Sequence, residues 1–267
     1  MSRVDKLTGD LPVGHGIGLE IGALYKPIVP PDTNGIHYAD HLSTEELRQK
    51  YAGDSSVDPD ALVPVTYICK NLSLLEAVGS AKFDYVIASH VIEHIPNPIR
   101  WLLDIASMLN EGGKLALAIP DKRYVFDCKR ELTSFADIVD AYLEERMRPS
   151  FRQVLDYFSC VADVPAGASP ADLWSGEIKA ADVPLRHPEI VADFGEQWFR
   201  DHYEAIRDGA YIDVHCWVFT PESFTRIFDE LSKVGLFPYK VVSFHTTADR
   251  DMEFFITLEP TIGSRED

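Results

Sequence analysis

Residues Phe83–Pro120 read FDYVIASHVIEHIPNPIRWLLDIASMLNEGGKLALAIP, and this stretch decides the fold. A buried-strand pattern at Tyr85–Ala88 is followed by a helical pattern at Pro98–Leu109 and a second apolar run at Lys114–Ile119. The helical pattern places its apolar residues on one face and stops before a Gly-Gly pair. A strand, a helix and a second strand in this order predict two parallel neighbouring strands of an α/β sheet.

Polar side chains follow both strands at the point where each one ends. Ser89 and His90 come after the first strand, and Asp121 comes after the second. In open α/β sheets, ligands bind at the edge formed by the carboxyl ends of the strands. We therefore expect an enzyme whose site lies at this edge.

Other segments with strand character precede and follow this stretch, and most are continuous apolar runs, as in parallel sheets covered on both faces. Helical stretches are expected between the first five strands, and the one at Thr44–Tyr51 opens with a capping-box pattern. The pattern predicts a Rossmann-like, doubly wound sheet that ends in one hairpin unit. The additional strands are expected at Gly18–Ile21, Ile36–Ala39, Val65–Cys69, Lys240–Phe244 and Glu253–Leu258.

The pattern changes after the fifth strand, because residues from about 126 to 213 contain no convincing strand. We read a single domain over residues 1–267 with a helical insertion at approximately 126–213. Long insertions at a ligand edge usually form lids or walls of the substrate site. Helices are expected at 135–142, 151–158 and Glu189–Arg207, and again at Glu222–Val234 behind a Thr220 cap.

Composition excludes several classes of partner. The net charge is −18, and an acidic surface repels both phosphate backbones and anionic membranes. The four cysteines form no Cys-x-x-Cys pair, and no run of about 18 apolar residues could span a bilayer. The start of the chain lacks the apolar core of a signal peptide. We expect a cytoplasmic protein with no nucleic-acid partner and no membrane insertion, and we leave the option of a homo-oligomer open.

The first strand and its turn have the frame of a nucleotide-type site. Gly22 lies in the turn, and Asp40 ends the second strand 20 residues after Glu20, where an acid can bind two ribose hydroxyls. A pyrophosphate normally requires a series of glycines after the strand, and here only Gly22 falls in the turn. The frame favours an adenosine ligand without phosphates, and an NAD-dependent reductase remains the alternative.

Four segments carry a resemblance to a known family: LEIGALYKP, GIHYAD, FDYVIASHVIEHIPNP and NEGGKLALAIPD. Over about residues 16–121 the chain resembles class I S-adenosylmethionine-dependent methyltransferases, in the broad methyltransferase-11-like group. The resemblance implies a mostly parallel sheet with an antiparallel C-terminal strand. It also implies S-adenosylmethionine as the cofactor.

The same resemblance implies a contact for each part of the cofactor. Asp40 would hold the ribose hydroxyls, and Asn71 and Leu72 would lie at the adenine. A non-catalytic protein that binds S-adenosylmethionine stays an alternative, because the first glycine motif is short. The residues expected beside the methionine moiety and the sulfonium are Glu20, Gly22, Ala23, Ser89 and His90.

A rival reading rests on His90-x-x-Glu93-His94, which matches a zinc-peptidase arrangement. Histidines at i and i+4 share a helix face and can chelate zinc, so a zinc hydrolase is the alternative from another class. The motif follows directly on a buried strand within a nucleotide-type frame, which a peptidase does not need. We therefore expect no metal ligands here.

Methyl transfer to a hydroxyl needs a base, because a neutral hydroxyl is a weak nucleophile. His90, Asp121 and His215 are the candidates, since each lies just after a strand or just before the last helix. The aromatic residues of the insertion suit a sugar, whose faces are apolar and whose rims are polar. We expect O-methylation of a sugar, glycan or other small-molecule acceptor.

Overall fold

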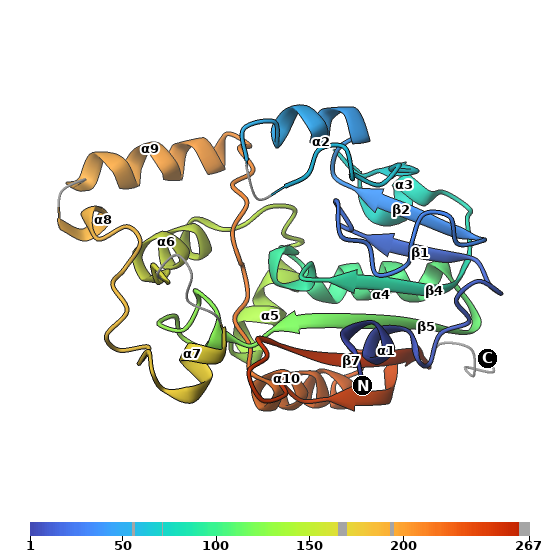
Figure 1. Ribbon diagram of the computed structural model, residues 1–267. Helices are drawn as coiled ribbons and strands as arrows, with labels where there is room; N and C mark the ends of the chain where they lie inside the picture. The colour runs from blue at the N-terminus through green and yellow to red at the C-terminus, as the bar shows by residue number, and fades with distance from the viewer. Residues whose placement is uncertain (55–56, 71, 165–169, 193–194, 262–267) are drawn as a thin grey trace.

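The computed structural model describes residues 1–54, 57–70, 72–164, 170–192 and 195–261 (Figure 1). One seven-stranded sheet has the order β3-β2-β1-β4-β5-β7-β6. Strand β7 runs antiparallel to β5 and β6, and the other neighbouring strands are parallel, which confirms the predicted fold class. The strands are β1 (Gly18–Ile21), β2 (Ile36–Asp40), β3 (Tyr67–Ile68), β4 (Phe83–Ser89), β5 (Leu109–Pro120), β6 (Tyr239–His245) and β7 (Glu253–Pro260).

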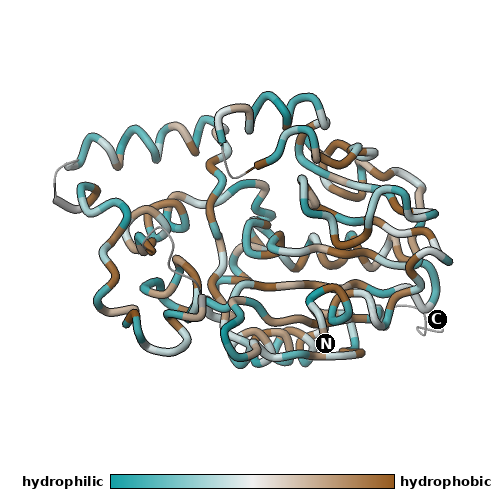
Figure 2. The backbone as a smooth tube through the Cα atoms, viewed as in Figure 1, coloured by the Kyte–Doolittle hydropathy of each residue, from teal (hydrophilic) through white to brown (hydrophobic). Residues whose placement is uncertain are grey.

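Helices cover the two faces of the sheet unequally. One face packs against α3, α4, α5 and α10 in a large apolar cluster, whereas the other contacts α1 and the loop after β1. Figure 2 shows hydrophobic stretches along the central strands and alternating colours along α9. The helices are α1 (Arg3–Thr8), α2 (Thr44–Lys50), α3 (Leu74–Val78), α4 (Pro98–Met108), α5 (Phe135–Leu143), α6 (Phe151–Cys160), α7 (Pro170–Ser175), α8 (Glu189–Ala192), α9 (Gly195–Arg207) and α10 (Pro221–Lys233), with short 3-10 turns η1 (Ile92–His94) and η2 (Lys122–Tyr124).

The connection between β1 and β2 corrects one prediction. Residues 22–35, all of which are described, contain turns and no helix, although we expected helices between the first five strands. Pro27, Pro30 and Pro31 explain the difference, because proline lacks the N–H that a helix interior needs. The loop instead packs Ile28 and Val29 against the sheet.

Two other elements differ from the sequence expectation. Strand β3 has two residues rather than the five predicted, because it lies at the edge of the sheet and pairs with β2 alone. Within the helix expected at Glu189–Arg207, the described residues form α8 and α9, and residues 193 and 194 between them are not described. Gly195 has φ +62°, which a right-handed helix interior does not tolerate.

The insertion lies beyond the carboxyl ends of the parallel strands, with α6, α7, α8 and α9 on that side of the sheet (Figure 1). The described part of the insertion contains one isolated bridge, between Ala162 and Leu185, and no strand. The edge of the sheet predicted to bind ligand therefore faces the insertion.

Among the described helices, none combines the length and the apolar composition that crossing a bilayer requires.

Candidate active site

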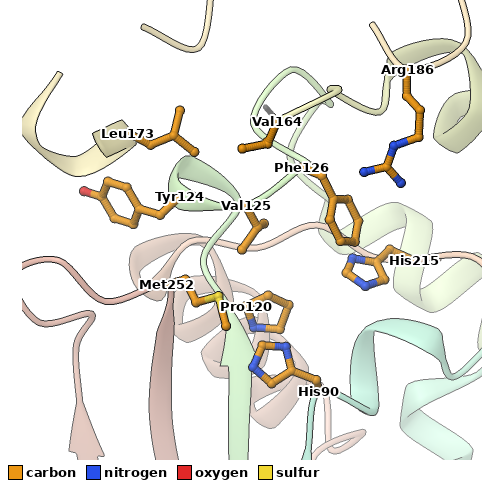
Figure 3. Close-up of a pocket in the computed structure, with 10 residues that line it drawn as sticks. All are labelled: His90, Pro120, Tyr124, Val125, Phe126, Val164, Leu173, Arg186, His215 and Met252. Atoms are coloured by element: carbon orange, nitrogen blue, oxygen red, sulfur yellow. The ribbon is translucent and has the colours of Figure 1, made fainter. Parts of the chain in front are cut away.

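A pocket of about 290 Å³ lies between the ends of β4 and β5 and the insertion. Its walls come from three places: the strand ends, the segment after β5, and the insertion with the segment that follows it (Figure 3). The wall is mostly apolar, with two histidines and one arginine among the polar groups. The lining residues are His90, Pro120, Tyr124, Val125, Phe126, Val164, Leu173, Arg186, His215 and Met252.

His90 enters this pocket from the turn that ends β4. Its backbone has φ +54°, an uncommon conformation for a non-glycine residue, and its N–H donates to the carbonyl of Ala118. The ring Nε2 lies 2.8 Å from Oε2 of Glu253, and Nδ1 lies 3.6 Å from Oε1 of Glu93. Burial lowers the pKa of His90, but the hydrogen bond to Glu253 and the charges of Glu93 and Glu253 outweigh it, so the pKa is raised.

His215 enters the same pocket from the segment between the insertion and α10. Its Nδ1 lies 2.5 Å from Oδ2 of Asp127, and Oδ1 of Asp127 accepts a 2.8 Å hydrogen bond from Arg130. Both Asp127 and Arg130 are buried. Burial raises the pKa of Asp127, but the hydrogen bond and charge of His215 and the charge of Arg130 hold it below its ordinary value. The ring of His215 is thus fixed by a carboxylate.

Asp121 is placed differently from the other two base candidates. It is fully buried, and its carboxylate takes three hydrogen bonds of 2.6–3.2 Å from the guanidinium of Arg123. Thr247 donates a further bond of 2.7 Å to Oδ2. Asp121 is not among the residues that line the pocket, so the structure brings together His90 and His215 but gives Asp121 a structural role.

The expected cofactor side starts at the turn after β1. Gly22 has φ +69°, and a Cβ there would lie 3.1 Å from Cγ2 of Val91. Ala23 follows in the same turn. Asp40 ends β2 as predicted, is 7% exposed, and accepts a 2.7 Å hydrogen bond from the N–H of His41 through Oδ1. A tight turn that begins with a glycine therefore lies beside a buried acid at the ends of adjacent strands.

The side chain of Glu20, expected beside the methionine moiety of the cofactor, accepts hydrogen bonds from the protein backbone. Its two carboxylate oxygens accept hydrogen bonds of 2.7 Å and 3.0 Å from the N–H groups of Ile28 and Val29. Burial raises the pKa of Glu20 to about 7, against the opposing effect of those two backbone donors. Glu20 therefore holds the β1–β2 loop to the sheet through both of its carboxylate oxygens.

Of the three remaining cofactor candidates, Ser89 and Leu72 are among the described residues and Asn71 is not. Ser89 ends β4, and its Oγ accepts a 2.5 Å hydrogen bond from Arg3 of α1. Leu72 is 50% exposed, and Asn71 lies outside the described residues. Arg3 also contacts Glu253, which ties α1 to the His90 side of the site. The sequence reading missed Arg3 because nothing in its local pattern indicates a contact with β4.

The rival zinc-hydrolase geometry is not formed. The 3-10 turn η1 begins at Ile92, so His90 precedes it and does not share a helix face with His94. His90 turns towards Glu253, whereas Nδ1 of His94 lies 2.9 Å from Oδ1 of Asp213. The two histidines of the motif therefore face different partners.

The sequence reading also missed residues of the insertion that shape the pocket. Asp127 and Arg186 are the most important, because they supply the partner of His215 and the pocket's guanidinium. Their only sequence signal was a position inside the insertion. Long-range contacts of this kind do not follow from local periodicity.

The chain is similar to several known proteins. A family model described as "Methyltransferase domain" matches residues 34–231. The ubiquinone biosynthesis O-methyltransferase of Parvibaculum lavamentivorans is 39% identical over 54 residues, which cover 20% of this chain and 21% of that protein. The chain thus spans about a fifth of that curated relative in the matched stretch.

Several solved methyltransferase structures are also similar. The CcbJ methyltransferase from Streptomyces caelestis is 18% identical with a TM-score of 0.31, over 49% of this chain and 51% of that one. The glycopeptide N-methyltransferase MtfA, complexed with S-adenosyl-L-homocysteine, is 11% identical with a TM-score of 0.42, over 96% and 88%. A methyltransferase from Mesorhizobium loti is 10% identical with a TM-score of 0.42, over 96% and 98%.

Similarities at this level say nothing of the acceptor. The family match is different in kind, because it covers most of the chain, from the start of β2 to α10. The protein belongs to the methyltransferase-domain family.

Proposed function

We propose that the enzyme methylates a hydroxyl of a small acceptor bound in the pocket between the sheet and the insertion. The observation that carries this proposal is the position of His90 and His215 on the walls of one mostly apolar pocket at the carboxyl ends of β4 and β5. That position adjoins the turn and strand ends where the cofactor is expected. An acceptor placed there would meet the methyl group without crossing the sheet.

The cofactor side of the proposal rests on Gly22, Ala23 and Asp40. A Cβ at Gly22 would make a tight contact with Val91, and its absence lets the backbone itself approach a ligand. The carboxylate of Asp40 can accept hydrogen bonds from two ribose hydroxyls. S-Adenosylmethionine, when bound, supplies an activated methyl group on a sulfonium, and these residues hold and orient it.

The acceptor class follows from the pocket walls. Valine, leucine, phenylalanine and methionine side chains line most of it, which suits an apolar or aromatic body better than a free sugar with hydroxyls on every rim. Arg186 adds a guanidinium, which pairs best with a carboxylate or another planar acid. Of the two acceptor classes expected from the sequence, these walls favour a small acidic metabolite over a sugar or glycan.

The acceptor hydroxyl belongs on the His215 side of the pocket. His90 already lies between two carboxylates, and Asp121 is paired with Arg123. His215 has one nitrogen bound to Asp127 and the other left for a further partner. The curated relative, named as an O-methyltransferase, supports oxygen as the methylated atom.

Two of the alternative functions lose their basis. The match to a methyltransferase family argues against an NAD-dependent reductase. His90 and His94 do not share a helix face, which argues against a zinc hydrolase built on this motif. Membership of an enzyme family likewise favours catalysis over a purely binding role. We also propose a cytoplasmic location, which the four free thiols support.

The experiment is an acceptor screen with an isotope-labelled methyl donor. Aromatic and aliphatic hydroxy acids, their methyl esters and free sugars would be incubated with the purified chain, and labelled products identified by mass spectrometry. We expect label on the hydroxyl oxygen of one or more hydroxy acids, with weaker labelling of the matching esters. Labelling confined to sugars, or to a nitrogen or carbon atom, would overturn the proposal.

A further inference from the structure

A second group of side chains lies beside the acceptor pocket and is not explained by cofactor binding. Glu93, His94 and His215 each bring one potential metal-ligand atom to the same point, with all three atoms within 4.8 Å of one another. Glu93 and His94 come from η1, and His215 comes from a segment more than one hundred residues later in the chain. The set therefore depends on the fold and not on a local motif.

Both histidines of the cluster have one ring nitrogen beside a carboxylate. Nδ1 of His94 lies 2.9 Å from Oδ1 of Asp213, and Nδ1 of His215 lies 2.5 Å from Oδ2 of Asp127. Among the described residues, neither Nε2 forms a hydrogen bond, so we take Nε2 as the nitrogen available to a metal. Metal-binding histidines usually have this arrangement, because the carboxylate fixes the tautomer and the ring orientation.

Glu93 supplies an independent observation. Its side chain is fully buried, and within the described part of the chain neither carboxylate oxygen has a hydrogen-bond partner. The ring of His90 is close, with Nδ1 3.6 Å from Oε1, but this distance is too long for a hydrogen bond. A buried carboxylate without hydrogen bonds is costly unless a cation compensates its charge. Its position beside two imidazoles indicates where that cation would lie.

The backbone holds the two parts of the cluster together. The carbonyl of Glu93 accepts hydrogen bonds of 2.7 Å and 3.2 Å from the N–H groups of Cys216 and Trp217. The indole N–H of Trp217 also donates to the carbonyl of Ile95. Since these bonds flank the ligands on both segments, the cluster is formed by well-packed backbone and not by mobile side chains alone.

We propose that Glu93, His94 and His215 bind a divalent transition metal, with zinc the best match. Two imidazoles and one carboxylate are a known zinc ligand set, whereas magnesium prefers oxygen ligands. Tetrahedral zinc needs donor atoms about 3.3 Å apart, so the side chains would close by about 1 Å or more on binding. This proposal replaces our expectation from the sequence that the chain has no metal ligands.

The role of this cation rests on the proposed function. Three protein ligands leave a fourth position, which the acceptor hydroxyl can take, and a bound cation lowers the pKa of that hydroxyl. The hydroxyl proton passes to solvent, and the oxygen forms a bond to the methyl carbon. The carbon–sulfur bond breaks with its electron pair kept by sulfur. His215 then acts as a metal ligand and not as the base.

The experiment measures metal binding directly on the untagged full-length chain. After treatment with a chelator, zinc would be titrated against a competing dye, bound metal counted by elemental analysis, and magnesium used as the contrasting probe. We expect one zinc per chain, zinc-dependent thermal stabilisation and no response to magnesium. Asp213→Asn should weaken zinc binding by about 10–100-fold, because Asp213 orients a ligand. Glu93→Gln and His94→Asn remove ligand atoms, so each should weaken zinc binding by at least as much.

Two features of the design keep the result clear. His187→Asn is the matched control, since His187 is also half-buried and lies 3.3 Å from a carboxylate, that of Glu189, outside the cluster. Asp213 is exposed enough for its variant to fold if Glu93→Gln does not. No zinc binding, or equal affinity in His94→Asn, Asp213→Asn and His187→Asn, would overturn the proposal. If the chain bound S-adenosylhomocysteine but not zinc, only this inference would be overturned. If it bound zinc but not S-adenosylhomocysteine, the proposed function would be overturned.

Discussion

The sheet and the insertion contribute to the site in different ways. The proposed cofactor side is built from strand ends, where Gly22 and Asp40 are placed by the parallel pairing of β1 with β2. The acceptor side is built from the insertion, where Asp127, Arg130 and Arg186 are placed by ion pairs and ring contacts. A regular hydrogen-bond ladder fixes the first group, and a few long-range contacts fix the second.

This difference explains why residues at the strand ends can be predicted from sequence, whereas their partners inside the insertion cannot. Strand ends in a parallel sheet meet at one edge whatever their side chains are. The partners inside the insertion depend on how its helices pack. The two regions should therefore respond differently to substitution.

The largest effect on stability is expected inside the insertion. Asp127→Asn would leave the buried guanidinium of Arg130 with one partner, the more exposed Asp156. Breaking a buried pair costs about 3–5 kcal/mol of the free energy of unfolding. Urea denaturation would measure this cost. Asp140→Asn, which removes a surface pair with Arg146, is the control and should cost less than about 1 kcal/mol. Equal costs for the two variants would contradict the account.

The next largest effect is a pH dependence on the sheet side. The pKa of Glu20 is about 7 in the folded state and near 4.5 when unfolded. Between these values the unfolded chain binds fewer protons, so stability falls as pH rises, by at most roughly 3 kcal/mol. Relative to Glu20→Gln, the wild type should therefore lose stability from pH 4.5 to 7 and change little above that. A difference that is flat across this window, measured by denaturation at each pH, would refute the burial of this carboxyl.

A third prediction tests the acceptor side by kinetics. Arg186→Gln should raise KM for a hydroxy-acid acceptor by about 10–100-fold, because a charge-assisted hydrogen bond is lost. The affinity for S-adenosylhomocysteine should not change. Arg152→Gln is the control, since that side chain is 85% exposed on the insertion. If both variants raised KM equally, Arg186 would not bind the acceptor, and the assignment of this pocket to the acceptor would be contradicted.

The smallest expected effect separates backbone strain from ligand binding. Gly22→Ala and Gly79→Ala both force alanine to a positive φ, at a cost of roughly 1–3 kcal/mol each. The added Cβ meets Val91 at position 22 and nothing within 4 Å at position 79. Both variants should melt earlier, but only Gly22→Ala should lose affinity for S-adenosylhomocysteine. Loss of affinity in both would show that the effect is indirect.

The sequence was sufficient for the sheet because periodicity and strand ends are local signals. The mostly parallel sheet, the C-terminal hairpin and the position of Asp40 at the end of β2 were predicted and are confirmed. The absence of a helix between β1 and β2 was not predicted. We expected a helix there because helices usually alternate with strands, although three prolines in this segment disfavour one.

The candidate site was predictable in part for the same reason. His90 and His215 were both identified, and they line one pocket. Asp121 was identified by the same rule, but it pairs with Arg123, a contact that its position after β5 does not reveal. The Asp127–His215 and Asp213–His94 pairs join distant segments, and no local pattern predicts such contacts.

The most direct test of the central claim is calorimetric titration with S-adenosylhomocysteine, with NAD as the comparison ligand. Asp40→Asn is the test variant, and Asp60→Asn, an exposed aspartate in a loop, is its control. The account predicts saturable binding to the wild type and to Asp60→Asn, weakened at least about tenfold in Asp40→Asn, with no binding of NAD. Absence of binding to the wild type, or equal affinity in Asp40→Asn, would contradict it.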